Sequence, residues 1–235
     1  MNSFRFQQFS ISQEHSALKL GTDAVILGAS ATFEHPKSIL DIGTGTGILA
    51  LMMAQKYPCP ITAIDIDEGA IADATLNVCN SPWKERITVK TQSLQDFSST
   101  NVQFDGIICN PPFFSNGLTN KDLRKTLARH TINLTPDILF SCVEKILSPI
   151  GQVAIIVPFQ EKENFISAAI QHSIMLAQDI SVFPFTSDCK PNRSILSFSR
   201  KWQPLQTRTL HVREDKNIYS AEYKKLTKEF YLGVG

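Results

Sequence analysis

Short apolar runs along the chain alternate with longer segments in which apolar residues recur at helical spacing. The short runs predict strands at 38–43, 61–66, 87–90, 104–110, 151–158, 175–184 and 192–199. The segments between them predict helices at 47–57, 67–80, 136–148 and 161–172. Because strands that alternate with helices form parallel sheets covered on both faces, we expect a doubly wound, seven-stranded, mostly parallel α/β sheet. A short connector joins the last two strands, which predicts an antiparallel pair at the sheet edge.

The two ends of the chain lie outside this alternation. Residues 1–30 contain three phenylalanines, then a turn and a short helical pattern, so we expect a short N-terminal cap segment. Residues 200–235 are charged and close on a helical pattern, which predicts a basic C-terminal extension. A length of 235 residues suits one domain, so the sequence predicts a single domain over residues 1–235.

Composition narrows the class of protein. Hydrophobic residues make up 43% of the chain, which is enough for a sizeable core and argues against disorder. No apolar run reaches the roughly eighteen residues that a membrane span needs, and no signal peptide is visible, so we expect a cytoplasmic protein without membrane contact. The cysteines are too far apart for a metal knuckle or a redox motif, which favours free thiols and no metal: they stand at 59, 79, 109, 142 and 189.

Charge is distributed unevenly between the two halves of the chain. Residues 1–120 carry 7 Lys/Arg and 11 Asp/Glu, and residues 121–235 carry 16 and 11. The net charges are therefore −4 and +5, although the whole chain is only +1. The second half is the better candidate for contact with a polyanion, and an ordinary solvated surface is the alternative.

A glycine-rich loop, "DIGTGTG", joins the strand at 38–43 to the helix at 47–57. Glycine permits a sharp turn and a close approach of a ligand to the backbone. The dinucleotide fingerprint G-x-G-x-x-G fails because Ile48 takes its last position, which disfavours an NAD enzyme. Asp65 ends the next strand, 22 residues after Gly43, where a carboxylate can accept the ribose hydroxyls of a nucleoside. A generic tight turn followed by a helix-capping acid is the alternative.

The pattern Asp-x-Gly-x-Gly-x-Gly resembles the first motif of class I S-adenosylmethionine-dependent methyltransferases. The resemblance implies a Rossmann-like methyltransferase fold, S-adenosylmethionine as cofactor and S-adenosylhomocysteine as product. Ser93 takes the position at which that family often has an acid beside the adenine, and Asp96 is an alternative for this role. The cofactor-binding residues implied in this way are Lys19, Thr22, Asp41, Gly43, Gly45, Gly47, Asp65, Ile66, Ser93, Leu94 and Asn110.

The strand at 104–110 ends in "NPPF", residues 110–113. Proline cannot continue a central strand, so the strand stops at Asn110 and the following residues are held stiffly at its carboxyl end. In open α/β sheets this end is where ligands bind. The alternative is a rigid turn with a core phenylalanine.

This box resembles the Asn-Pro-Pro-Tyr/Phe box of methyltransferases that alkylate planar sp² nitrogens. The resemblance implies that the Asn110 side-chain oxygen and the Pro111 carbonyl accept the two N–H groups of an exocyclic amine. Phe113 would stack on the base face. Phenylalanine at the fourth position is frequent in guanine-N2 enzymes, so Phe113 taken alone favours guanine.

The ends of the chain favour adenine instead. The first thirty residues resemble the opening of the bacterial tRNA(Val) adenine-N6 methyltransferases, which modify position 37, at Lys19, Gly21, Thr22, Asp23, Leu27, Gly28 and Ala29. Residues 81–87, 192–199 and 219–232 resemble the same family. The resemblance implies N6 methylation of an adenosine in tRNA by a monomer. A guanine-N2 RNA methyltransferase, a protein glutamine N5-methyltransferase and an RNA-binding protein with an inactive site are the alternatives.

Basic residues after the box are candidates for phosphate contact. They stand at near-helical spacing, and are Lys121, Arg124, Lys125 and Arg129. The C-terminal extension adds Arg200, Lys201, Arg208 and Arg213. A solvated basic face is the alternative in both segments.

Overall fold

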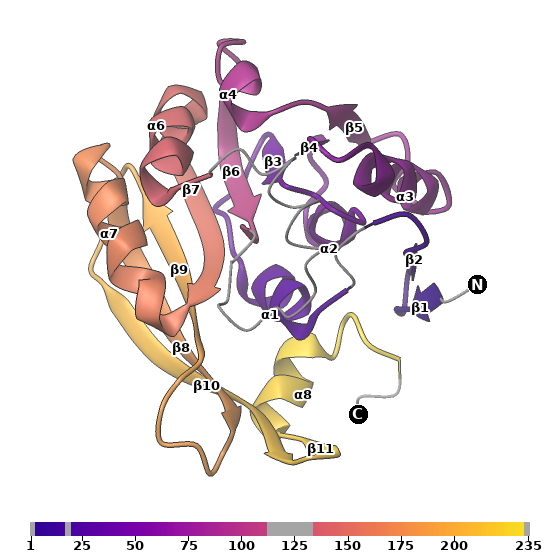
Figure 1. Ribbon diagram of the computed structural model, residues 1–235, viewed down its shortest axis with the longest axis vertical. Helices are drawn as coiled ribbons and strands as arrows, with labels where there is room; N and C mark the ends of the chain where they lie inside the picture. Colours follow the sequence, from indigo (N-terminus) through magenta and orange to yellow (C-terminus); the bar gives the residue numbers. More distant parts are fainter. Residues whose placement is uncertain (1–2, 17–19, 112–133, 233–235) are drawn as a thin grey trace, which may run out of the picture.

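The computed structural model describes residues 3–16, 20–111 and 134–232. Within them, nine strands form one twisted sheet in the order β11-β10-β8-β9-β7-β6-β3-β4-β5 (Figure 1). The strands are β3 (Ile39–Ile42), β4 (Ile61–Asp65), β5 (Ile87–Thr91), β6 (Phe104–Cys109), β7 (Leu147–Pro158), β8 (Met175–Phe185), β9 (Arg193–Ser199), β10 (Gln206–Asp215) and β11 (Ile218–Tyr219). A separate hairpin contains β1 (Ser3–Arg5) and β2 (Ser10–Ser12).

Helices cover both faces of the sheet. They are α1 (Thr22–Ser30), α2 (Ile48–Lys56), α3 (Glu68–Cys79), α4 (Leu94–Phe97), α6 (Pro136–Ile146), α7 (Lys162–Gln171) and α8 (Ala221–Thr227), with a 3₁₀ turn η1 (Phe159–Glu161) before α7. Side chains of α1, α2, α3 and α8 share one apolar core with one face of the sheet. Side chains of α4, α6 and α7 form a second core on the other face. Figure 1 shows α6 and α7 on the opposite side of the sheet from α1 and α8.

The predicted doubly wound, mostly parallel class is confirmed, but the sheet has two strands more than the predicted seven. Both come from the C-terminal segment, because β10 pairs in parallel with β8 and β11 pairs with β10. The predicted antiparallel pair of β8 and β9 is present, but it lies inside the sheet and not at its edge. In β10 only Leu210 and Val212 are buried, so the strand has too short an alternation to be noticed in the sequence.

Helix α2 follows the glycine-rich loop and is buried nearly all round, from Ile48 to Ala54. Asp67 caps α3, because its side chain accepts the backbone N–H of Gly69. None of the helices in the described ranges is long and apolar enough to cross a bilayer.

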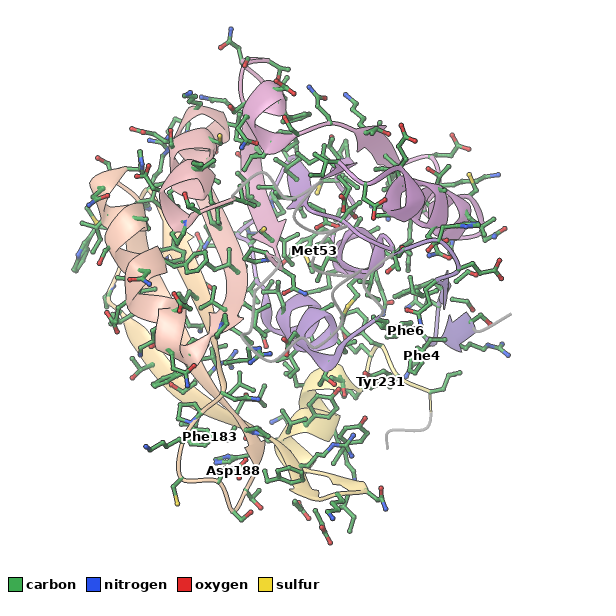
Figure 2. All side chains as sticks on the ribbon, in the orientation of Figure 1. Phe4, Phe6, Met53, Phe183, Asp188 and Tyr231 are labelled. Atoms are coloured by element: carbon green, nitrogen blue, oxygen red, sulfur yellow. The ribbon has the colours of Figure 1, made fainter. Side chains whose placement is uncertain are left out.

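The N-terminal hairpin packs against the C-terminal segment. Phe6 stacks between Phe9 and Tyr231, with ring centroids 4.6 and 5.6 Å away, and Phe4 lies at the edge of the same group (Figure 2). Gln7 donates its side-chain amide to the carbonyls of Lys228 and Tyr231. The two ends of the described chain therefore stabilise each other beside α2 and α3.

Candidate active site

The glycine-rich loop lies at the carboxyl end of β3 and leads into α2. Gly43, Gly45 and Gly47 have φ of 67°, 55° and 81°, a left-handed region that other residues rarely adopt. A Cβ atom at Gly43 or Gly45 would meet no atom within 4 Å, so the backbone there faces open space. The loop therefore leaves room for a ligand against its main chain.

Asp41 lies under this loop and is completely buried. One of its oxygens accepts the Thr44 hydroxyl at 2.6 Å and the Ala50 N–H at 3.0 Å, while Oδ1 has no partner among the described residues. Burial raises the pKa of Asp41 to about 7, against the lowering effect of these two hydrogen bonds. Burial and the Asp41 and Asp65 carboxyls raise the pKa of the Cys109 thiol well above its ordinary value. The site thus holds a buried carboxyl group with one unpartnered oxygen. A cation bound nearby would favour the ionised form of this carboxyl group.

Asp65 connects the second strand to the loop. Its carboxylate accepts the backbone N–H of Gly45 at 2.8 Å and that of Asp67 at 3.0 Å. Burial raises the pKa of Asp65, and these backbone hydrogen bonds oppose the rise. Each carboxylate oxygen keeps a second lone pair for a ligand hydroxyl. The next residue, Ile66, exposes 38% of its surface and presents an apolar side chain at the same edge.

Asn110 and Pro111 stand beside the loop. In the register of β6 with β3, Cys109 pairs with Ile42, so the next residues, Asn110 and Gly43, lie at the same edge of the sheet. Asn110 is half-buried and its side-chain amide forms no hydrogen bond with another described residue, while Pro111 is buried. The predicted amine acceptors and the predicted cofactor loop are therefore adjacent.

Other predicted residues have mixed outcomes. Ser93 caps α4. Its hydroxyl donates to the Asp96 carboxylate and accepts the Asp96 backbone N–H, so the two side chains are hydrogen-bonded to each other. Leu94 is buried, and Thr22 is exposed at the start of α1. The following predicted residues lie outside the described residues: Lys19, Phe113, Lys121, Arg124, Lys125 and Arg129.

The first turn of α1 is tied to the same edge of the sheet. Arg193, at the start of β9, donates to the Asp23 carboxylate at 2.8 Å. Arg193 pairs across the sheet with Pro158, the last residue of β7. This ion pair positions Thr22 near the carboxyl ends of the parallel strands.

Two buried polar residues of α3 were not predicted to have a role. The Asp73 carboxylate accepts backbone N–H groups of Glu14, His15 and Ser16 together with the Ser16 hydroxyl. Burial alone would raise the pKa of Asp73, but the hydrogen bonds from the segment 14–16 lower it.

Asn77 lies one turn further along α3. Its side chain bonds both the N–H and the carbonyl of Ser12 and donates to the carbonyl of Thr46 in the glycine-rich loop. Asp73 and Asn77 therefore hold residues 12–16, which we call the strap, against α3 and the loop. Only the helical spacing in the sequence could have indicated that Asp73 and Asn77 are buried, because they lie on the same face of α3 as the buried Ala74 and Val78.

The arrangement can hold a nucleoside with a charged tail. Space beside the loop, the unpartnered Asp41 oxygen, the Asp65 carboxylate and exposed Ile66 fit the parts of S-adenosylmethionine: a cationic tail, a ribose and a planar base. No three His, Cys, Asp or Glu side chains gather into a possible metal site in the described part of the chain.

Comparisons with known proteins identify the family of this chain. Residues 15–141 match the family model of the methyltransferase small domain. The tRNA1(Val) (adenine(37)-N6)-methyltransferase of Phocaeicola vulgatus is 38% identical over 231 residues, which cover 98% of each chain. The enzyme of the same name from Tolumonas auensis is 39% identical over 233 residues, covering 98% of this chain and 97% of that one.

Solved structures show the same fold. A predicted O-methyltransferase from Agrobacterium tumefaciens superposes with a TM-score of 0.66 over 88% of this chain and 96% of its own, at 15% identity. Identity this low supports the fold alone. The family match and the full-length relatives go further, and they show that this chain belongs to the methyltransferase small-domain family and, within it, to the tRNA1(Val) (adenine(37)-N6)-methyltransferases.

Proposed function

We propose that this chain transfers a methyl group from S-adenosylmethionine to the exocyclic N6 of an adenosine in tRNA, at position 37 of tRNA(Val). The observation that carries the proposal is the placement of Asn110 and Pro111 beside the glycine-rich loop. The names of the full-length relatives supply the nucleoside and its position. We propose that the enzyme works in the cytoplasm and acts as a monomer.

The cofactor is held by residues of β3, β4 and the loop between β3 and α2. The backbone of Gly43 and Gly45 would line the tail, the buried Asp41 carboxylate beneath the loop would balance its positive charge, and Asp65 would accept ribose hydroxyls. S-adenosylmethionine supplies an electrophilic methyl group on a positively charged sulfur. Thr22, Ile66, Ser93 and Leu94 remain predicted contacts, and Lys19 is a further one outside the described residues.

The protein must make the amine a better nucleophile. The lone pair of an exocyclic amine is delocalised into the ring, so the free amine is nearly planar and reacts poorly. The Asn110 side-chain oxygen and the Pro111 carbonyl accept one N–H each and favour a tetrahedral nitrogen. As the new N–C bond forms, the bond between the methyl carbon and the sulfur would break, with its electron pair left on S-adenosylhomocysteine, and the nitrogen would lose one of these protons to water. Catalysis is then positioning and electrostatic stabilisation, without a strong base.

The substrate base must leave its stack to reach this site. A base in an anticodon loop is flipped at little cost because it is unpaired. Phe113 would stack on its face. The proposed phosphate contacts are Lys121, Arg124, Lys125 and Arg129. Like Phe113, these four lie outside the described residues.

The test is Asn110→Ala, assayed with labelled S-adenosylmethionine and unmodified tRNA. Loss of a preorganised hydrogen-bond acceptor should reduce methyl transfer by about 100- to 1,000-fold. Cofactor affinity, measured by calorimetry, should change little. Asn80→Ala, at the exposed end of α3, is the matched control and should keep full activity.

The labelled nucleoside decides between this proposal and its alternatives. N6-methyladenosine supports it. N2-methylguanosine, or label in protein that survives RNase treatment, refutes the proposed substrate. Normal turnover by Asn110→Ala refutes the proposed mechanism.

A further inference from the structure

A second cavity lies away from the proposed active site, between the end of α1, the end of α2, strands β8 and β10, and α8. Its volume is about 420 Å³, within the range of small-molecule sites. We call it the α1–α8 pocket. Ser30 and Lys56 contribute the C-terminal ends of α1 and α2 to its wall. These two helices begin at the carboxyl edge of the sheet, so the pocket lies toward the other edge.

Positive charge dominates the lining. Arg208 of β10, Lys225 of α8 and Lys228 after α8 all line the pocket and are exposed. None of the three forms an ion pair with a described residue. Unpaired cations converging on one cavity are the usual requirement for binding a polyvalent anion.

Two acids, Glu222 and Glu229, also line the pocket. Glu222 accepts the backbone N–H of His211 at 3.1 Å, and its carboxylate lies 3.7 Å from the imidazole of the same residue. Burial lowers the pKa of Lys56, which also lines the pocket, to about 8, and the charge of Glu229 opposes this shift. Two acids therefore stand against four basic side chains in the lining, and the balance stays positive.

The deep wall of the pocket offers a hydrogen-bonding group. Ser30 is only 5% exposed, and its hydroxyl has no hydrogen-bond partner among the described residues. Beside it, the Lys56 ammonium donates to the carbonyls of Gly28, Ala29 and Ala31. A buried hydroxyl without a partner costs free energy unless a ligand or water satisfies it. It can donate to an anionic oxygen.

We propose that the α1–α8 pocket is a phosphate-binding site, in which Arg208 and Lys225 hold the charge and the Ser30 hydroxyl donates to a phosphate oxygen. The phosphate belongs either to the backbone of the RNA substrate or to a small free molecule. The alternative in which the phosphate belongs to RNA rests on the proposed function.

Helix α1 sets the distance between this site and the active site. Its nine residues rise about 13 Å in total, at about 1.5 Å per residue. Thr22, at the other end of α1, lies at the edge where the methyl acceptor is expected. A separation of about 13 Å equals about four steps of a nucleic-acid strand at ~3.4 Å each, so one RNA can reach both places.

The first experiment measures binding of inorganic phosphate by phosphorus NMR at constant ionic strength. The wild type should bind phosphate saturably, and Arg208→Ala/Lys225→Ala should lose most of this binding. Lys84→Ala/Lys145→Ala removes the same charge from exposed positions outside the pocket and should behave as the wild type. Ser30→Ala should weaken phosphate binding about tenfold without removing charge. Equal phosphate binding by all four proteins would overturn the site.

The second experiment identifies the source of the phosphate. Anisotropy with labelled tRNA at several salt concentrations should show that Arg208→Ala/Lys225→Ala binds more weakly than the control pair. For this double variant, the slope of the logarithm of the binding constant against the logarithm of the salt concentration should fall by about one in magnitude. Lost phosphate binding with unchanged tRNA binding would keep the site and overturn the RNA source. Because the NMR measurement needs no tRNA, it tests the pocket even if the chain fails to methylate tRNA.

Discussion

The Asp73 carboxylate holds residues 14–16 of the strap against α3. Replacing Asp73 by alanine removes the acceptor of three backbone N–H groups and one hydroxyl. All of these donors belong to residues 14–16, and the two shortest bonds, both 2.7 Å, come from Ser16. We therefore expect the substitution to release the strap and to lower the stability of the fold.

The magnitude follows from the two short bonds. A hydrogen bond to a charged group contributes about 1.5–3 kcal/mol, and the lower figure applies here because the released donors can turn to water. Two such bonds give a loss of about 3 kcal/mol in the free energy of unfolding. For a chain of this size this lowers the melting temperature by about 6–12 °C.

The sign of the pH dependence is also determined. In the folded protein, hydrogen bonds from residues 14–16 lower the pKa of Asp73 below its ordinary value of 3.8. The carboxylate therefore contributes its stability above about pH 4, and this contribution is lost as the pH falls through the lowered folded value. The difference between the wild type and Asp73→Ala should be constant from pH 5 to 8 and should shrink toward pH 3.

Denaturant unfolding monitored by circular dichroism measures both effects. Thr75→Ala, an exposed position of the same helix, is the control and should change the free energy by less than about 0.5 kcal/mol. Hydrogen exchange of the amides of residues 14–16 should speed up in Asp73→Ala alone. A loss no larger than that of Thr75→Ala, or one that grows as the pH falls to 3, would refute this reasoning.

Two further predictions concern the cofactor site. Because the pKa of buried Asp41 is about 7 and a cationic ligand favours its ionised form, affinity for S-adenosylmethionine should fall by up to about tenfold per pH unit as the pH drops below 7. Calorimetry with Asp41→Asn should show no such dependence; a pH-independent wild type would contradict this role. Gly45→Ala introduces a side chain at a φ of 55° with no atom in its way, so only the backbone cost of about 1–2 kcal/mol applies. An unchanged free energy of unfolding in denaturant would contradict this predicted cost.

The parts of the molecule that could be predicted from the sequence are those encoded over short distances. The apolar run before Asp41 and the spaced glycines after it predict a strand, a turn and a buried helix, and all three are present. The adjacency of Asn110 and the loop also follows, because carboxyl ends of parallel strands meet at one edge.

The rest depends on contacts between distant residues. β10 pairs with β8, although paired residues such as Gln206 and Gln178 are 28 positions apart and β9 lies between the two strands in the chain. No local pattern specifies this pairing. Asp73 and Asn77 are ordinary polar residues of an amphipathic helix until the strap is placed on them. Ser30 gave no signal because the α1–α8 pocket is assembled from five separate segments.

The packing of Phe6 against Tyr231 has a consequence for the order of events during synthesis. Gln7 and Tyr231 are hydrogen-bonded although 224 positions separate them. The N-terminal hairpin therefore leaves the ribosome long before its partner and completes its packing only after residue 231 emerges. A nascent chain has already made the glycine-rich loop by then, at a pace of about 5–20 residues per second. We therefore expect the newborn protein to complete its sheet first, with the packing of the N-terminal hairpin against residues 228–231 as the last step of its folding.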